Sequence, residues 1–247
     1  MPENFFGEDV AARYDDDTAI FDPDVVDPVV DFLAGLAGEG AALELGIGTG
    51  RIALPLSQRG VRVQGIDLSE EMVARLRAKP GGEEIPVAVG DFASTRVEGR
   101  FTLAYVVYNT IGNLTTQEAQ TACFRNVAAH LEDGGCFLVE LGVPELRRLP
   151  PGDTMRVFQS SETHWGIDEY DVAGQGLTSH HFVRLDDGRF ELVSMPFRYV
   201  WPAELDLMGR LAGLVLRERW SDWDRSAFTG ESRSHVSVWE KVAETSL

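Results

Sequence analysis

The sequence lacks the features that place a protein in a membrane, outside the cell or around a metal ion. No apolar run approaches the roughly 20 residues of a membrane-spanning helix. Residues 1–9 do not have the basic and then apolar layout of a secretory signal. The only two cysteines, Cys123 and Cys136, lack the Cys/His spacing of a zinc site, so we interpret both as buried thiols. These absences predict a cytoplasmic protein with no membrane contact and no metal site.

Basic residues are also scarce. The chain has 22 Lys and Arg against 40 Asp and Glu, a formal net charge of −18. Such a field repels phosphate backbones, and the basic stripe that nucleic-acid binding needs is missing. The composition therefore argues against a DNA or RNA partner. It says little in favour of a cationic ligand, because a negative surface also serves solubility.

The chain does have a regular alternation of strand and helix patterns. Its 247 residues are 44% apolar, which suits one α/β domain with an insertion or one domain plus a small lobe. The alternation predicts a parallel sheet flanked by helices. Expected strands cover residues 41–45, 61–66, 86–89, 102–107 and 136–141. Expected helices cover residues 28–36, 52–59, 70–78 and 115–131.

Local signals predict some of the helix ends. Ser69 is a good N-cap for the helix that follows it. Thr115 and Glu118 match a capping box at the start of the next expected helix. The run Asp133-Gly134-Gly135 predicts where that helix ends.

The pattern changes after Pro144. Residues 156–200 alternate in the β manner without helical stretches, and Asp187-Gly188 is a hairpin signal within them. This stretch predicts an antiparallel insertion. Pro202 suits the first turn of a last helix. Two closing strands are expected after it, over residues 215–220 and 236–241.

The most informative motif is the run Glu44-Leu45-Gly46-Ile47-Gly48-Thr49-Gly50, between the first expected strand and its helix. Glycines let a ligand approach the backbone closely, and the helix N-terminus behind them offers free N–H groups. A nicotinamide dinucleotide fingerprint needs glycine at the sixth position of the motif. Counted from Gly46, that position is Arg51. The loop therefore predicts a ligand other than NAD, with a structural turn that binds no ligand as the alternative.

Carboxylates follow the next two expected strands. Asp67 ends the second strand, where a carboxylate can accept both hydroxyl protons of a ribose. Asp91 ends the third, in Gly90-Asp91-Phe92. An Asp after a strand is often only a turn residue. In doubly wound sheets, however, ligands bind at the carboxyl ends of successive strands, so the series Gly46, Asp67, Asp91 predicts a ligand along this edge.

Together these elements resemble the class I S-adenosylmethionine-dependent methyltransferases, over residues 14–141. The likeness rests on the glycine loop, Gly65-Ile66-Asp67-Leu68-Ser69, Gly90-Asp91-Phe92 and residues 107–114, which look like the segment after the fourth strand in small-molecule members. The resemblance implies S-adenosylmethionine as the cofactor. It also implies an α/β fold with a seven-stranded, doubly wound, Rossmann-like sheet in the order 3-2-1-4-5-7-6, strand seven being antiparallel.

The resemblance implies roles for single residues as well. The loop glycines would line the methionine part of the cofactor, Asp67 would hold the ribose, and Asp91 with Phe92 would contact the adenine. Tyr14 looks like the tyrosine of an N-terminal cap over the cofactor. The full set expected to line the cofactor is Tyr14, Glu44, Gly46, Ile47, Gly48, Gly50, Asp67, Leu68, Met72, Asp91, Phe92 and Tyr108.

Four segments are expected along the chain. They are an N-terminal cap (1–27), the cofactor-binding core (28–145), an antiparallel insertion that acts as a substrate lid (146–200), and the last helix with the closing strands of the core (201–247). The insertion is similar in placement to that of amino-sugar N-methyltransferases and glycine N-methyltransferase. The sugar enzymes have a histidine where this chain has Asn113, which argues against a base-assisted sugar N-methylation.

No general base stands out. An amine that is deprotonated at working pH needs none, whereas a hydroxyl usually does. The candidates in the insertion are His164, Asp168, Glu169, His180 and His181, although each is more simply explained as an ordinary strand residue. Adjacent strand residues face opposite sides, so at most one of His180 and His181 can face the site. Aromatic side chains that could wall a substrate pocket are Trp165, Tyr170, Phe197, Tyr199 and Trp201.

Different functions stay open at this point. The first is transfer of a methyl group to nitrogen or oxygen of a small molecule. The alternative is a methyltransferase homologue with a non-methylating role, either a cyclase-type reaction or a regulatory binding module. We also expect residues before Asp22 to become ordered when the cofactor binds. The competing explanation is that the insertion is a homodimer interface and the N-terminal segment a disordered tail.

Overall fold

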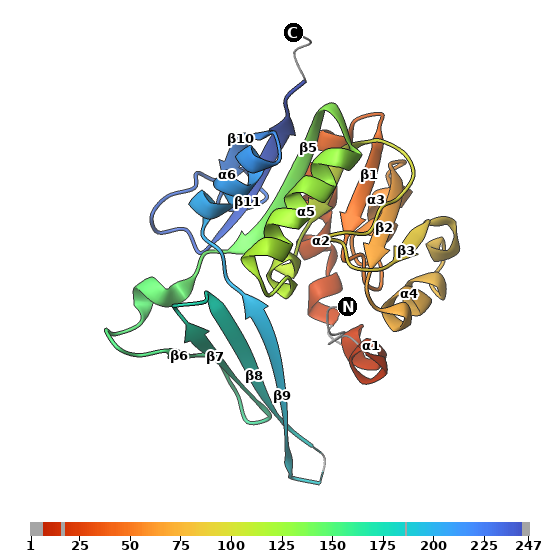
Figure 1. Ribbon diagram of the computed structural model, residues 1–247. Coiled ribbons are helices and arrows are strands. Elements are labelled where there is room, and N and C mark those ends of the chain that lie inside the picture. The colour runs from red at the N-terminus through yellow and green to blue at the C-terminus, as the bar shows by residue number, and fades with distance from the viewer. Residues whose placement is uncertain (1–6, 16–17, 186, 244–247) are drawn as a thin grey trace.

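Two β-sheets organise the chain (Figure 1): a seven-stranded sheet with helices on both faces, and a four-stranded antiparallel sheet that projects from it. The computed structural model describes residues 7–15, 18–185 and 187–243. Phe5 and Phe6, at the start of the expected N-terminal cap, lie outside the described residues.

The large sheet has the strand order β3-β2-β1-β4-β5-β11-β10. Strands β1 to β5 are parallel, and β11 is antiparallel to both β5 and β10. This confirms the predicted order and the antiparallel seventh strand. The strands are β1 (Ala41–Leu45), β2 (Arg62–Asp67), β3 (Val87–Val89), β4 (Phe101–Val106), β5 (Leu131–Gly142), β10 (Leu214–Trp220) and β11 (Ser234–Lys241).

Helices cover both faces of this sheet because its strands are apolar on both sides. On one face the core is built around Phe124, Phe137 and Trp239. The Phe124 ring meets the Phe137 ring edge to face at 4.9 Å between centroids and the Trp239 ring at 5.4 Å. The helices are α1 (Glu8–Tyr14), α2 (Pro23–Ala37), α3 (Ala53–Gln58), α4 (Glu70–Arg77), α5 (Gln117–His130) and α6 (Pro202–Leu211). Short 3-10 helices are η1 (Thr18–Phe21), η2 (Gly82–Glu84), η3 (Thr110–Asn113) and η4 (Glu145–Arg148). No helix within the described ranges is long and apolar enough to cross a membrane.

Helix α2 begins earlier than the sequence predicted. We expected it to start at Pro28, but it starts at Pro23, with Asp22 accepting a hydrogen bond from the Asp24 N–H at 2.9 Å. Proline at the first helical position and an Asp cap form a complete start signal. Pro28 then lies inside the helix, where it removes the one backbone bond that its missing N–H would have made.

Both ends of α5 differ from the prediction. Thr116 caps the helix, accepting from the Ala119 N–H at 3.1 Å, so Thr115 and Glu118 do not form the expected capping box. At the other end, β5 starts directly after the helix, and the expected stop at residues 133–135 lies inside the strand. There the pairing with β4 jumps, from Phe101 opposite Leu131 to Leu103 opposite Cys136. Glycine suits such a bulge, and Gly134 has a φ of +79°.

The projecting sheet has the order β6-β7-β8-β9, which confirms the predicted antiparallel insertion before the last helix. Its strands are β6 (Met155–Ser160), β7 (His164–Asp171), β8 (Gly176–Arg184) and β9 (Phe190–Arg198). The Asp187-Gly188 turn joins β8 to β9, as predicted.

A buried ion pair fastens this sheet to the body. Arg198, at the end of β9, is 3% exposed and lies 2.7 Å from Glu204 of α6. The same guanidinium donates to Gln120 of α5 and, at 2.9 Å, to Gln175, which precedes β8. Because this one guanidinium bonds to three segments, its removal would leave the Glu204 carboxylate without its cation.

Candidate functional site

The glycine loop follows β1 at the carboxyl edge of the large sheet. Gly46, Gly48 and Gly50 have φ values of +71°, +55° and +81°, a conformation that favours glycine. A side chain at Gly46 would also lie 2.5 Å from Cγ2 of Thr110 in η3. The loop therefore needs glycine for its backbone path and for the close approach of the segment after β4.

Asp67 ties this loop to the next strand and helix. Its Oδ2 accepts from the Gly48 N–H at 2.6 Å, and its Oδ1 accepts from the Ser69 N–H at 2.9 Å. Ser69 in turn caps α4, as predicted, by accepting from the Met72 N–H. Asp67 is 9% exposed, and burial raises the pKa of its carboxyl group. Each oxygen keeps a second lone pair, so the carboxylate can still accept from a ligand.

Glu44 lies beneath the loop. It is 4% exposed, and the Tyr105 hydroxyl donates to its Oε2 at 2.9 Å. Burial raises the pKa of Glu44 to about 8. At neutral pH its carboxyl group is therefore mostly protonated and adds little negative charge under the loop.

The segment after β4 makes a tight turn that faces the glycine loop. Tyr108 and Asn109 have φ values of +57° and +60°, which is strained for residues with a side chain. Glu140 of β5 accepts from the Tyr108 N–H, and the Asn109 Oδ1 accepts from the Gly142 N–H at 2.7 Å. These contacts hold the turn and leave the Tyr108 side chain 48% exposed.

Arg51 connects the turn to the N-terminal segment. Its guanidinium carbon lies 4.6 Å from the centroid of the Tyr108 ring, and its Nη1 donates to the Ile20 carbonyl at 3.2 Å. Its charge also opposes the rise in the pKa of Tyr14 that burial causes, which places Tyr14 at the same edge. From the sequence, Arg51 was significant only because it stands where a dinucleotide motif needs glycine.

Asp15 fastens the end of α1 to the same loop. Its Oδ1 accepts from the Thr49 hydroxyl at 2.7 Å, and its Oδ2 lies 2.7 Å from the Lys79 ammonium group. Lys79 also donates to the Thr49 carbonyl at 2.8 Å. Asp15, Lys79, Arg51 and Glu140 were not predicted as site residues, because their partners lie 30 or more residues away in the chain.

The remaining predicted residues surround the loop from neighbouring strands. Phe92 is 7% exposed, with ring atom Cε1 3.9 Å from the position that a Gly46 Cβ would take. Asp91 accepts from the Ala93 N–H at 2.8 Å. Ile47 is buried, with its side chain against Gly65 of β2, so the loop presents its backbone there. The Met72 methyl group lies 3.4 Å from the Cβ position of Gly48, while Leu68 is half-buried.

The three candidate histidines lie on the projecting sheet. His180 and His181 face opposite sides, as predicted. His181 shares a face with Phe197, because Phe197 pairs with Leu177 and His181 with Val193. We call this the inner face, since Phe197 contacts Gly112 of η3, beside the turn after β4. His164 is on the inner face too, hydrogen-bonded to His181.

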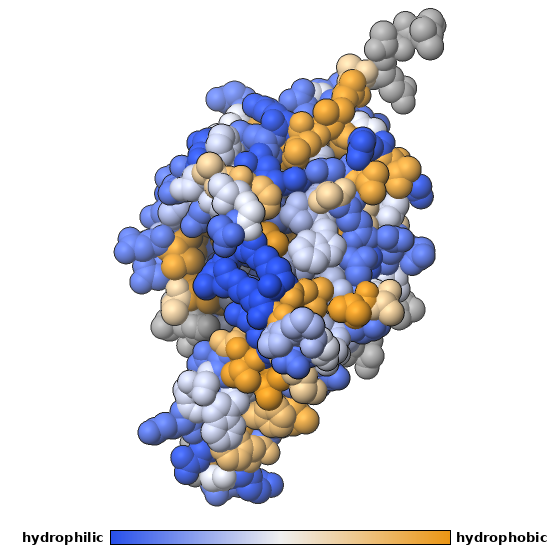
Figure 2. All heavy atoms as spheres, turned by 90° about the vertical axis from the view of Figure 1, so that its left-hand side faces the viewer, coloured by the Kyte–Doolittle hydropathy of each residue, from blue (hydrophilic) through white to orange (hydrophobic). Residues whose placement is uncertain are grey.

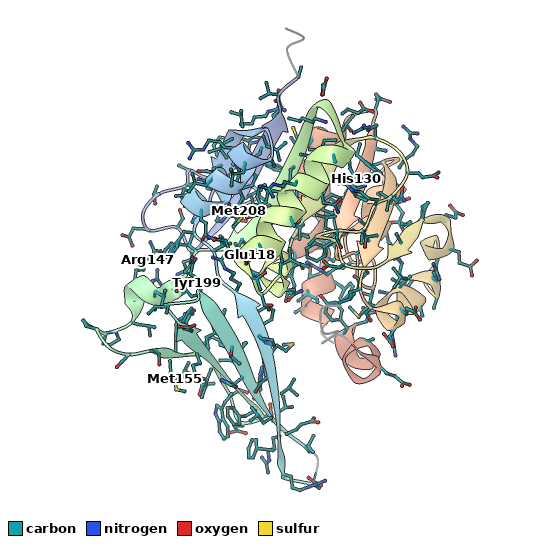
Figure 3. All side chains as sticks on the ribbon, in the orientation of Figure 1. Glu118, His130, Arg147, Met155, Tyr199 and Met208 are labelled. Atoms are coloured by element: carbon teal, nitrogen blue, oxygen red, sulfur yellow. The ribbon has the colours of Figure 1, made fainter. Side chains whose placement is uncertain are left out.

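The opposite, outer face carries His180, which contacts Glu169 and Ser194. Trp165, expected as a pocket wall, lies here with its ring stacked 5.0 Å from that of Phe190. Met155 is 56% exposed and Val157 60%. Figure 2 shows apolar side chains along the projecting sheet, and Figure 3 shows Met155 pointing away from the body, with Tyr199 at the junction.

Comparisons with known proteins agree with this geometry. A family model described as a methyltransferase domain matches residues 42–135. The CcbJ methyltransferase from Streptomyces caelestis is 38% identical, with a TM-score of 0.79 over 87% of this chain and 89% of that one. CalS10, an amino pentose methyltransferase from Micromonospora echinaspora, is 20% identical and shares the fold, with a TM-score of 0.70 over 97% of this chain and 99% of its own.

A curated relative is a protein of Geobacillus sp. (strain WCH70) named as a methyltransferase. It is 25% identical over 162 residues, which are 64% of this chain. The match spans just under two thirds of that relative's own length, at 66%.

Proposed function

The chain belongs to the class I S-adenosylmethionine-dependent methyltransferases, and from this we propose that it transfers the cofactor's methyl group to a nitrogen or oxygen of a small organic molecule. The cofactor of this family is S-adenosylmethionine. The proposal covers the size of the substrate, the acceptor atom and the roles of single residues.

The observation that carries the proposal is the pairing of the left-handed glycine loop with Asp67. Three glycines with positive φ leave the backbone at the sheet edge open to close contact, as a methionine chain would need. Asp67 is already fixed by the Gly48 and Ser69 N–H groups, so it can accept ribose hydroxyls without losing side-chain freedom. Phe92 and Asp91 follow β3, where they would contact an adenine. Tyr14 and Tyr108 would cover the methionine side.

When bound, the cofactor supplies an electrophilic methyl group on a positively charged sulfur. The protein's own contribution is to align the acceptor atom and to exclude water. Glu44 adds little negative charge beneath the loop at pH 7, since its pKa is about 8. No residue is assigned as general base. This fits an amine acceptor, which can react after losing its proton to water.

The expected division of the chain follows from the same proposal. Residues 1–27 would cap the cofactor, residues 28–145 would bind it, residues 146–200 would form the far wall of the substrate site, and residues 201–247 would complete the core. The contacts of Asp15 and Arg51 with the glycine loop support the capping role. A cytoplasmic location and a homodimer stay predictions.

A product assay tests the proposal. The protein is incubated with S-adenosylmethionine carrying a labelled methyl group and with a panel of amino sugars, other small amines and phenols. We expect label in one class of acceptor and equimolar S-adenosylhomocysteine. Label in no acceptor, despite tight cofactor binding, would favour the non-methylating alternative. The matched control is Asp67→Ala, which should lower turnover at limiting cofactor.

A further inference from the structure

The segment that follows β3 folds into a tight turn through its own backbone. The N–H groups of Ser94 and Thr95 donate to the Asp91 carbonyl at 3.0 and 2.7 Å. The Asp91 Oδ1 accepts from the Ala93 N–H at 2.8 Å, so the turn also orients this carboxyl group. We call residues 91–97 the β3 loop. Under the proposed function this loop contacts the adenine, so the residues that fix its place also fix that contact.

Asn126 of α5 binds the β3 loop at two points. Its Nδ2 donates to the carbonyls of Phe92 and Thr95, at 2.9 Å in both cases, which uses both protons of the amide. Asn126 is 3% exposed, and its buried Oδ1 has no hydrogen-bond partner among the residues that the structure describes. A buried acceptor without a partner destabilises a fold, and Asn is a poor residue for a helix interior. The benefit of this residue therefore lies in the two loop carbonyls that it holds.

His130, the last residue of α5 (Figure 3), binds the β3 loop at a third point. Its Nδ1 lies 2.8 Å from the Asn126 carbonyl, which can only accept, so Nδ1 carries a proton. The Val97 N–H donates to its Nε2 at 3.1 Å, so Nε2 must be unprotonated. Both hydrogen bonds are therefore made together only by the neutral ring.

The surroundings of His130 favour the neutral ring. The side chain is 3% exposed, and burial is the main cause that lowers its pKa below the ordinary value of 6.5. The positive charges of Arg96 and Arg100, which lie on either side of Val97 in the chain, lower it further. A protonated ring has no lone pair for the Val97 N–H. The contact is therefore complete at pH 7 and is lost as the pH falls through the lowered pKa.

The contacts with α5 also decide where the β3 loop lies relative to the glycine loop. Phe92, whose carbonyl Asn126 holds, has its ring atom Cε1 3.9 Å from the position that a Gly46 Cβ would take. The backbone bonds within the β3 loop shape the turn, but they do not connect it to the rest of the fold. The bonds from α5 make that connection, 30 or more residues away in the chain.

We propose that Asn126 and His130 are positioning residues for cofactor binding, which hold the β3 loop where Asp91 and Phe92 meet the adenine, and that full affinity requires His130 to be neutral. The inference rests on the proposed function, because the adenine belongs to S-adenosylmethionine. Without either contact, the loop spends less time in the position that binds the ligand. The apparent Kd then rises in proportion, since only the competent fraction of the protein binds.

Calorimetric titration with S-adenosylhomocysteine at pH 7.5 tests the two residues. Asn126→Leu removes the donor of both loop carbonyls at similar volume and should raise the Kd roughly tenfold. His130→Leu should also raise it, whereas His130→Gln, whose amide oxygen can accept from the Val97 N–H, should stay within a factor of two of the wild type.

The matched control is Thr116→Ala, at the opposite end of α5. It weakens the helix cap without touching the β3 loop, so its Kd should equal that of the wild type. An unchanged Kd in both Leu variants would overturn the inference. An equal rise in Thr116→Ala would also overturn it, because any weakening of α5 would then have the same effect. If the wild-type protein does not bind S-adenosylhomocysteine, the proposed function itself is refuted.

The same titration at several pH values tests the neutral ring and does not depend on the folding of a Leu variant. As the pH falls from 7.5 to 5, the Kd of the wild type should rise at least twofold more than the Kd of His130→Gln. Other groups near the ligand, such as Asp67 and Asp91, titrate in both proteins and cancel in this ratio. A ratio of the two Kd values that stays constant with pH would overturn the requirement for a neutral His130.

Discussion

The two sheets of this protein bury their side chains to very different extents. In the seven-stranded sheet, Leu43 of β1 and Leu103 of β4 are fully buried, because helices cover both faces. In the projecting sheet, Val157 is 60% exposed and Leu192 55%. The first sheet forms its proposed ligand site from backbone at the strand ends. The second presents side chains on two open faces. Under the proposed function, cofactor binding and acceptor recognition would lie in regions that bury their side chains to different extents.

The largest effect we expect is a fall in the free energy of unfolding with rising pH, caused by Glu44 of the large sheet. Glu44 has a pKa of about 8 in the fold against 4.5 as a free side chain. As pH rises from about 4.5 to 8, the unfolded chain loses this proton and the folded protein keeps it, so stability falls by about 1.4 kcal/mol per pH unit. Glu44→Gln should remove this loss, and exposed Glu39→Gln should not. Urea unfolding at pH 5, 6.5 and 8 measures these free energies. If the difference in unfolding free energy between the wild type and Glu44→Gln stays constant with pH, the raised pKa of Glu44 is refuted.

The next effect concerns the junction of the two sheets. Arg198→Met leaves Glu204 and Gln120 without their buried cation and should cost about 3 kcal/mol. Hydrogen exchange should become faster in β9 before it does in β1. Arg189→Met, which removes an ion pair at the exposed tip, should not move the unfolding midpoint. Equal destabilisation by both variants would mean that the junction is not what holds the insertion.

An effect of similar size is expected at the glycine loop. Gly46→Ala forces a side chain into a left-handed conformation and within 2.5 Å of Thr110, at a cost of about 2 to 4 kcal/mol. Gly60→Ala has the same conformational strain, with a φ of +90°, but nothing within 4 Å of the added carbon. The difference in their unfolding free energies isolates the close approach of η3 to the loop. Equal losses of unfolding free energy in the two variants would mean that η3 moves aside at no cost.

The smallest effect tests the corrected helix cap. Thr116→Ala should cost about 1 kcal/mol, since its hydroxyl group accepts from the Ala119 N–H. Thr115→Ala should change stability by less than about 0.5 kcal/mol, like most surface substitutions. Thermal unfolding of the two variants is sufficient. The reverse order would restore the capping box that the sequence suggested.

The sequence predicts the large sheet well because its signals are local. The glycine loop, Asp67 at the end of β2 and Ser69 before α4 each act within a few residues of one another along the chain or across neighbouring strands. The strand order came from resemblance to a family, and the pairing of β11 between β5 and β10 confirms it.

What the sequence could not predict depends on contacts between distant residues. Glu140 supports the turn at Tyr108 from 32 residues away, and nothing near either residue signals this. The same is true of Asp15 and Thr49, 34 residues apart. On the projecting sheet, alternation predicted only that His180 and His181 face opposite sides, and the strand register then placed His164 on the face of His181.

The most direct test of the central claim is calorimetric titration of the protein and its Asp67→Ala variant. The wild-type protein should bind S-adenosylhomocysteine with a Kd on the order of micromolar and should not bind NAD measurably. Loss of the charge-assisted acceptor should weaken binding by about 2 to 3 kcal/mol. The unfolding midpoint without ligand should barely change. Tighter binding of NAD, or an Asp67→Ala affinity within a factor of two of wild type, would contradict the account.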